Sequence, residues 1–235
     1  MIKLKDILLE GVYDKTSLKA VIMSGGPGSG KTYVAKQLFG FDKTLERANL
    51  SSFGMKRMDL DYFYTYMMKK HGYSVNLSNM ENDPKMKDID KTIRAAAIQQ
   101  YDKQKDLWID ERIGIILDTV SSNLGKVRDN KKRLEDNGYD VICIFIDTPL
   151  EIALQRNKNR ERKLPDDLVR KMWQECENNK EELQNIFGNN LYIIKNDDIS
   201  QIQKRVNKFL SEPVENPIGK AWIELQLKLK DRLNK

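Results

Sequence analysis

The sequence has little of the chemistry on which many enzymes depend. Its 235 residues include one histidine, His71, and two cysteines, Cys143 and Cys176, which stand far apart. This scarcity argues against a zinc site and a histidine general base, and it fits a reducing, cytoplasmic setting. No apolar stretch reaches membrane-spanning length, so we expect no membrane partner. Charges interrupt the N-terminal MIKLKDILLEGV too early for a secretory signal.

What the chain does have is typical of a soluble α/β domain. Hydrophobic residues make up 40% of it and charged residues 32%, with a formal net charge of +6 and a pI near 9.1. The length fits one sizeable domain with a small appendage. The basic balance is compatible with a nucleic acid or another polyanion, but a protein that handles nucleotides needs local positive charge in any case.

The most informative motif is Gly25–Thr32, GGPGSGKT, directly after the apolar run Ala20–Met23. It has the G-x-x-x-x-G-K-[ST] spacing of a phosphate-binding P-loop, in a strand–loop–helix setting. We therefore expect ATP and Mg²⁺ as cofactors, with Lys31 on the β- and γ-phosphates and Thr32 on the metal. The other expected nucleotide-binding residues are Gly26, Gly28, Ser29, Gly30 and Tyr33.

Apolar strands alternate with helical patterns, which predicts a parallel sheet covered by helices on both faces, the three-layer α/β fold of P-loop NTPases. The predicted strands are Ala20–Ser24, Met55–Asp59, Ile113–Asp118, Val141–Ile146 and Leu191–Ile194. Helices are expected at Lys31–Leu38, Tyr62–Lys70, Ile89–Trp108 and Leu124–Asn137. The predicted domain, 20–210, contains an irregular insertion at 71–88 and a lid at 150–165; it lies between an N-terminal segment, 1–19, and a linker with an amphipathic helix, 211–235.

Three carboxylates follow predicted strands, where the ligands of such sheets gather. Asp118 ends its strand like a Walker-B acid that holds Mg²⁺, although an aspartate there can also cap the next turn. Either Asp59 or Asp61 could accept the proton of an attacking hydroxyl, as a phosphotransferase requires, although Asp61 could also simply cap the helix expected from Tyr62. Asp59 is a third candidate, on the substrate side.

The segment Ile152–Leu164 is rich in cations. Arg156 and Arg160 are four residues apart, so on one helix they share a face. In a lid that closes over bound ATP they would meet the transferring phosphoryl group. A charge run is more often a solvated helix face, but this one follows a predicted strand beside the nucleotide site.

Together these features resemble a known family. The P-loop, the sequence MDLDY at Met58–Tyr62 and the stretch Leu117–Trp173 look like the kinase domain of phage polynucleotide kinases, and they are similar to the zeta-toxin kinases. That stretch holds a strand ending in Asp-Thr and an R-N-x-x-R sequence before Leu-Pro-Asp. The resemblance covers roughly Val21–Phe187 and implies a kinase domain alone, with five parallel strands and the P-loop strand central. It also implies the host cytoplasm, if the gene is a phage's.

By that resemblance, Asp61 is the base that activates the acceptor hydroxyl, and Arg160, with Arg156 beside it, is the lid cation on the γ-phosphate. The implied catalytic residues are Lys31, Asp61 and Arg160. Three residues after the base these families tend to have a substrate-gripping cation, where this chain has Tyr64. A tyrosine could stack on a base or sugar, or it could belong to the nonpolar face of its helix. Candidate replacement cations are Lys56, Arg57 and Arg94.

The terminal segments are candidates for an oligomer or assembly contact. One apolar set is Ile2, Leu4, Ile7 and Leu8, and a second, on one face of the C-terminal helix, is Ile218, Trp222, Leu225 and Leu229. Such a helix more often packs on its own domain than on a partner, and we expect that here.

Three functions stay open from the sequence. The first is a kinase that transfers the γ-phosphoryl group of ATP to a hydroxyl of a nucleic-acid 5′ end, a nucleoside or nucleotide, or a sugar nucleotide. The second is an ATPase whose hydrolysis drives a conformational or assembly step. The third is a non-catalytic nucleotide-binding module. Asp61, as a candidate proton acceptor, favours the first.

Overall fold

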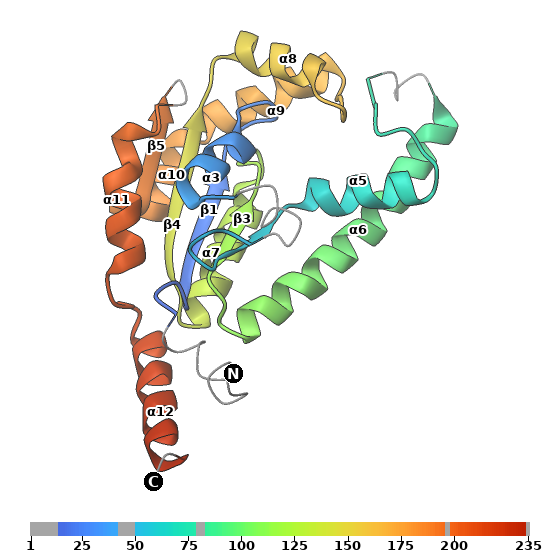
Figure 1. Cartoon of the computed structure of the whole chain (residues 1–235). Helices are drawn as coiled ribbons and strands as arrows, with labels where there is room; N and C mark the ends of the chain where they lie inside the picture. The colour runs from blue at the N-terminus through green and yellow to red at the C-terminus, as the bar shows by residue number, and fades with distance from the viewer. Residues whose placement is uncertain (1–13, 42–49, 79–82, 196–197, 234–235) are drawn as a thin grey trace.

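The computed structural model describes residues 14–41, 50–78, 83–195 and 198–233. Within them, five parallel strands form one sheet in the order β2-β3-β1-β4-β5 (Figure 1). The strands are β1 (Lys19–Ser24), β2 (Lys56–Met58), β3 (Ile115–Asp118), β4 (Asp140–Asp147) and β5 (Leu191–Lys195). The predicted five-stranded parallel sheet is confirmed, with the P-loop strand β1 at its centre.

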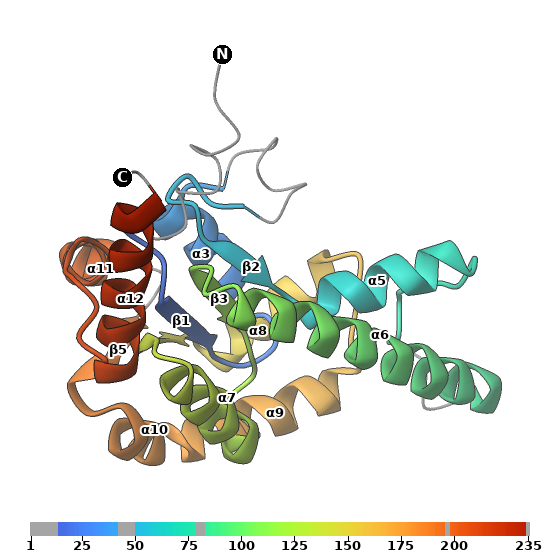
Figure 2. The ribbon, with the colours of Figure 1, turned by 90° about the horizontal axis from the view of Figure 1, so that it is seen from below.

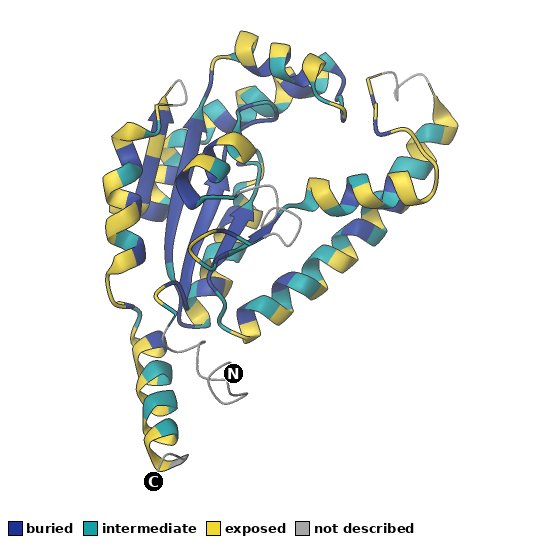
Figure 3. Ribbon diagram, in the orientation of Figure 1, coloured by how far each residue is buried: buried dark blue, intermediate teal, exposed yellow. Residues whose placement is uncertain are grey.

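Helices cover both faces of the sheet, as the view from below shows (Figure 2). On one face lie α3 (Lys31–Phe39) and α11 (Ser200–Ser211). On the other lie α7 (Leu124–Asp136), α9 (Asp166–Asn178) and α10 (Lys180–Phe187). The strands between them are buried almost throughout (Figure 3), which matches their near-continuous apolar sequences. The expected three-layer fold is therefore confirmed.

The register of the sheet brings the predicted functional positions to one edge. Met23 of β1 pairs with Asp118 of β3, and Leu117 of β3 pairs with Met58 of β2. Because the strands are parallel, the segments that follow them begin at the same edge. The P-loop, Asp59 and Asp118 are therefore neighbours.

Two helices, α5 (Leu60–Lys70) and α6 (Pro84–Asp110), pack on each other and project sideways from the β2 side of the sheet (Figures 1 and 2). The prediction that this second helix begins at Ile89 was wrong, and the predicted insertion is correspondingly shorter. Asp83 caps the helix by accepting the N–H of Met86 at 3.1 Å, and a proline suits the first helical position because its missing N–H needs no partner there.

The C-terminal helix α12 (Pro217–Leu233) leaves the body beyond the base of the sheet (Figure 1). Its start packs closely: a Cβ on Gly219 would stand 2.2 Å from the carbonyl oxygen of Gly138, and the Arg112 guanidinium lies 5.1 Å from the Trp222 ring centroid. Three apolar side chains stay exposed, those of Ile218, Leu225 and Leu229. The expected packing of this face on the body is thus confirmed for Trp222 and wrong for Ile218, Leu225 and Leu229. The apolar set Ile2, Leu4, Ile7 and Leu8 lies outside the described residues.

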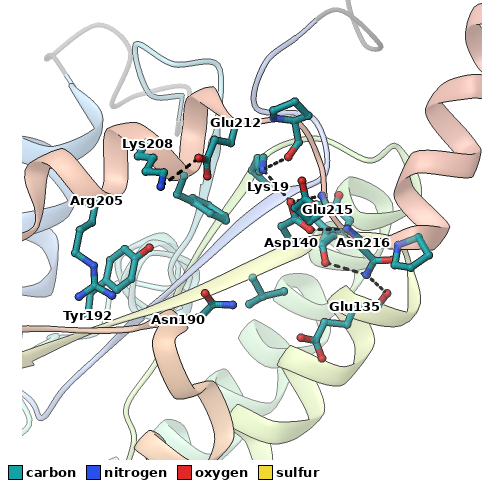
Figure 4. Close-up of a pocket in the computed structure, with 15 residues that line it drawn as sticks. Lys19, Glu135, Asp140, Asn190, Tyr192, Arg205, Lys208, Glu212, Glu215 and Asn216 are labelled. Carbon is teal, nitrogen blue, oxygen red and sulfur yellow. Dashed lines mark hydrogen bonds and ion pairs between the residues drawn. The ribbon is translucent and has the colours of Figure 1, made fainter.

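Polar contacts fasten the chain between α11 and α12 to the base of the sheet (Figure 4). Lys19 Nζ lies 2.8 Å from Asp140 Oδ2, and Asp140 in turn accepts the backbone N–H groups of Glu215 and Asn216, each at 2.8 Å. These residues line a cavity of about 520 Å³ at the end of β1 opposite the P-loop. Because these polar groups bond to one another, we interpret them as the contacts that anchor the start of α12, and not as a ligand site. Among the described residues, no helix has the length and apolar character needed to cross a membrane.

Candidate active site

A cleft of about 940 Å³ opens where β1, β2 and β3 end. The P-loop forms one side of it, and α5, α6, α7 and the segment after α8 (Leu150–Asn159) form the other sides. Most of the predicted site residues line this cleft: Gly28, Ser29, Gly30, Lys31, Thr32, Asp59, Asp61, Arg94, Asp118, Arg156 and Arg160. Gly26, Tyr33 and Tyr64 do not line it.

Glycines shape the P-loop as the motif predicts. Gly28 and Gly30 have φ angles of 75° and 97°, which side chains disfavour, and a Cβ on Gly28 would lie 2.3 Å from the carbonyl oxygen of Ala153 in α8. No side chain caps the start of α3, so its positive end is open to an anion. Lys31 Nζ lies 3.1 Å from the Gly25 oxygen and 3.0 Å from the Gly26 oxygen. The loop therefore has the backbone and the cation that a phosphate chain requires.

Hydrogen bonds from residues that follow β4 along the chain support the P-loop backbone. The Ser29 carbonyl accepts hydrogen bonds from Thr148 Oγ1 at 2.8 Å and from Arg156 Nη1 at 3.0 Å. The Thr148 carbonyl accepts one from Trp173 Nε1 at 2.8 Å, and Gly26 packs against the same tryptophan. In this structure Arg156 therefore supports the P-loop backbone itself.

A buried arginine, Arg57, contacts both the P-loop threonine and the two carboxylates at the strand ends. Arg57, in β2, is 8% exposed, and its Nη2 lies 2.8 Å from Thr32 Oγ1, 2.8 Å from Asp59 Oδ2 and 3.0 Å from Asp118 Oδ2. Burial and the nearby Asp118 raise the pKa of Asp59 to about 6, which Arg57 partly offsets. The sequence offered Arg57 only as a cation for the acceptor, and the structure places it on the nucleotide side.

The same oxygen atoms fit a magnesium ion. A hydroxyl and two carboxylates from three separate elements converge on one point, and Mg²⁺ prefers such hard oxygen ligands. Asp118, Asp59 and Thr32 are therefore the residues that would hold it.

Asp59, rather than Asp61, caps the helix that follows β2. It accepts the Asp61 N–H at 2.9 Å, and the helix begins at Leu60, so the capping alternative for Asp61 was wrong. The Asp61 side chain is 51% exposed to the cleft, and its Oδ2 lies 2.8 Å from Nη1 of Arg162. Arg162 is a site residue that sequence reasoning missed. The cation-rich segment Ile152–Leu164 contains it, but helical spacing singles out only Arg156 and Arg160 there.

The prediction that Arg156 and Arg160 share a helix face was wrong. The helix α8 ends at Asn159, and Arg160 has an extended backbone. The Asn157 side chain explains the ending, because it both donates to the Leu164 carbonyl (2.8 Å) and accepts the Leu164 N–H (3.0 Å), which closes a loop over 158–163. Nε and Nη2 of Arg160 are buried without a hydrogen-bond partner. Burial and the neighbouring Arg162 lower the pKa of this guanidinium below its ordinary value.

Tyr64 is buried, with 1% exposure, so the structure agrees with the helix-face alternative and leaves no open ring for stacking. Its hydroxyl donates to Asp90 Oδ1 at 2.7 Å. The guanidinium carbons of Arg94 and Arg162 lie 4.8 and 5.0 Å from its ring centroid. Burial alone would raise the pKa of Asp90, but hydrogen bonds from Arg94 and Tyr64 lower it below its ordinary value. Tyr64 thus positions two arginines where the family pattern has one cation. No sequence signal pointed to Asp90.

The segment predicted as a lid, 150–165, is bonded to the chain that follows α5 and packs against α5 itself. The Leu77 N–H donates to the Lys163 carbonyl at 2.9 Å, and Leu154 and Leu164 pack in one nonpolar cluster with Tyr64 and Leu77. The segment after α5, within the predicted insertion, therefore contacts the lid directly.

The P-loop and the five-stranded parallel sheet define the fold of the P-loop NTPases. The model of the Zeta toxin family matches residues 10–208, which is most of the chain. The chain belongs to the Zeta toxin family. No curated protein sequence matches it.

Solved structures share the fold at low sequence identity. A chain of the AvrRxo1-ORF1:AvrRxo1-ORF2 complex with sulphate ions is 14% identical, with a TM-score of 0.57 over 81% of this chain and 62% of that one. The same complex with ATP gives a TM-score of 0.56 at 14% identity, over 81% of this chain and 61% of that one. A putative kinase from Chloroflexus aurantiacus j-10-fl is 14% identical, with a TM-score of 0.50 over 82% of this chain and 98% of that one. This chain therefore spans less than two thirds of the AvrRxo1 chain.

Proposed function

We propose that this protein is a kinase that binds ATP with Mg²⁺ and transfers the γ-phosphoryl group to a hydroxyl of a nucleic-acid 5′ end, a nucleoside or nucleotide, or a sugar nucleotide. One observation carries the proposal: the half-exposed carboxylate of Asp61 and the P-loop lysine Lys31 line the same cleft, together with Arg160, whose Nε and Nη2 have no hydrogen-bond partner. A kinase needs both a phosphate site and a proton acceptor, and here one cleft offers both.

The nucleotide side supports ATP as the donor. The open start of α3 and the P-loop glycines offer backbone N–H groups to the phosphates, and Lys31 adds a positive charge. The complex of AvrRxo1-ORF1 and AvrRxo1-ORF2, which has the same fold, was solved with ATP. A magnesium ion held by Thr32, Asp59 and Asp118 would offset negative charge on the phosphates.

In the proposed step, Asp61 takes the proton of the acceptor hydroxyl. The hydroxyl oxygen forms a bond to the γ-phosphorus, the bond from that phosphorus to the β–γ bridging oxygen breaks, and ADP leaves. Arg162 holds the Asp61 carboxylate in place. Arg160, whose buried nitrogens lack partners, would meet the charge that spreads over the transferring group.

The far part of the cleft favours a strongly polar acceptor. Charged and amide side chains of α6 and α7 line it: Asp90, Arg94, Asp102, Lys105, Lys126, Asp129 and Asn130. Side chains of both signs suit an acceptor that carries several hydroxyl, amide or phosphate groups, and they disfavour a simple apolar alcohol.

The test is transfer of labelled γ-phosphate to an acceptor panel of 5′-hydroxyl oligonucleotides, nucleosides, nucleoside monophosphates and sugar nucleotides. We expect one class to be labelled, and labelling to disappear in the Lys31→Ala variant. Rapid ATP hydrolysis with no labelled acceptor would contradict the proposal and support the ATPase alternative.

A further inference from the structure

The Arg57 guanidinium stands where a metal ion would be expected. One nitrogen, Nη2, contacts oxygen atoms of Thr32, Asp59 and Asp118 at 2.8, 2.8 and 3.0 Å. These atoms come from the first turn of α3, the residue after β2 and the last residue of β3. A single cationic group therefore bridges all three candidate metal ligands.

The arginine and a metal ion cannot occupy this point together. Mg²⁺ binds oxygen at about 2.1 Å, inside the space that Nη2 fills, and two cations in a buried site repel each other strongly. Arg57 is 8% exposed, so its charge is poorly screened by water. One cation must leave before the other can bind.

We propose that Arg57 is a place-holding cation of the metal site: it keeps Thr32, Asp59 and Asp118 in ligating positions and is exchanged for the divalent cation that arrives with the nucleotide. This inference rests on the proposed use of these residues for a metal-bound nucleotide. Arg57 is a positioning residue, since it would act on the metal ligands and not on the reacting atoms. It also makes the bare metal a poor ligand, because the ion must displace a buried ion-pair network without help from phosphate oxygens.

The test measures Mn²⁺ binding without nucleotide, by electron paramagnetic resonance, for the wild type, Arg57→Met, Arg57→Lys and the control Lys56→Met. Lys56 is the neighbouring cation of β2 and lies by the Trp108 ring, away from the metal ligands. We expect Arg57→Met to bind Mn²⁺ at least about tenfold more tightly than the wild type. Arg57→Lys, which keeps a cation, and Lys56→Met should stay near the wild type. Asp118→Asn in the Arg57→Met background should remove the gain.

The same variants still test the inference if Arg57→Met fails to fold. If Arg57→Met unfolds because two carboxylates lose their cation, Mn²⁺ should restore its folded circular dichroism and raise its melting temperature. The inference is overturned if folded Arg57→Met binds Mn²⁺ no more tightly than the wild type, or if Mn²⁺ fails to fold an unfolded variant. No nucleotide or acceptor is present, so a failure of phosphoryl transfer would be a separate result.

Discussion

The two sides of the cleft are built in different ways. On the nucleotide side, backbone groups form the site: the P-loop turns on glycines, and the Ser29 carbonyl is held by Thr148 and Arg156. On the side proposed for the acceptor, long side chains form it, through the pairs Asp61–Arg162 and Tyr64–Asp90. The first construction gives any triphosphate the same cradle. The second can change its acceptor by exchanging a few side chains, without altering the fold.

The largest expected effect comes from a substitution that disrupts only the P-loop backbone. Gly28→Ala adds a Cβ 2.3 Å from the Ala153 oxygen at a φ of 75°, so the P-loop and α8 must separate. We expect a loss of at least about 3 kcal/mol in unfolding free energy and at least about a 100-fold loss of ATP affinity. Gly72→Ala is the matched control, since Gly72 has a φ of 74° with nothing within 4 Å of the added Cβ. It should cost about 1 kcal/mol and leave ATP affinity unchanged. Stability is measured by chemical denaturation and ATP affinity by titration calorimetry. Equal losses in Gly28→Ala and Gly72→Ala would contradict this account.

A pH series tests the two buried carboxylates at the ends of β2 and β3. Asp59 has a folded-state pKa of about 6 against an ordinary value of 3.8. Its contribution to stability is present below pH 4 and is lost as the pH rises through 6, because the folded state holds the proton more tightly than the unfolded state does. With a metal chelator present, the unfolding free energy of Asp59→Asn relative to the wild type should rise by roughly 2 kcal/mol between pH 4 and 7. A flat difference between the two proteins would count against the buried, repelled carboxylate.

Arg162→Gln tests the side of the cleft that is built from long side chains and leaves the P-loop unchanged. It removes the charged partner of Asp61 and one of the two guanidinium groups on the Tyr64 ring. We expect phosphoryl transfer to fall about 10- to 100-fold with little change in ATP affinity. Arg170→Gln, at an exposed position of α9, is the control and should behave like the wild type. A loss of ATP affinity in Arg162→Gln equal to the loss of transfer would show that the two sides are not separate.

The smallest expected effect concerns the buried tyrosine. Tyr64→Phe removes the donor to Asp90 but leaves Arg94 on that carboxylate. The unfolding free energy should fall by about 1 kcal/mol, and the KM for the acceptor should rise more than the KM for ATP. Tyr66→Phe, at an exposed position of the same helix, should change neither value. An unchanged acceptor KM in Tyr64→Phe would remove Tyr64 from the acceptor side.

The same difference in construction explains how much could be predicted from the sequence. The P-loop motif and the apolar strands follow from local patterns, and the family resemblance implied five parallel strands with the P-loop strand central, so the sheet was predicted. The pair Asp61–Arg162 spans 101 positions and the bond Tyr64–Asp90 spans 26, and no local pattern encodes such contacts. Arg160 was placed on the wrong element because the Asn157 side chain, not a glycine or proline, ends α8. The exposed face of α12 could not be predicted either, since apolar spacing does not show whether the body extends far enough to cover it.

The central claim is that one cleft holds ATP by its P-loop and deprotonates the acceptor by Asp61. The most direct measurement compares ATP affinity and single-turnover phosphoryl transfer in Asp61→Asn and Lys31→Ala, with Asp136→Asn at an exposed site of α7 as control. We predict that Asp61→Asn keeps its ATP affinity within about threefold while transfer falls at least about 100-fold, and that Lys31→Ala loses both. Transfer by Asp61→Asn at the wild-type rate would contradict the account.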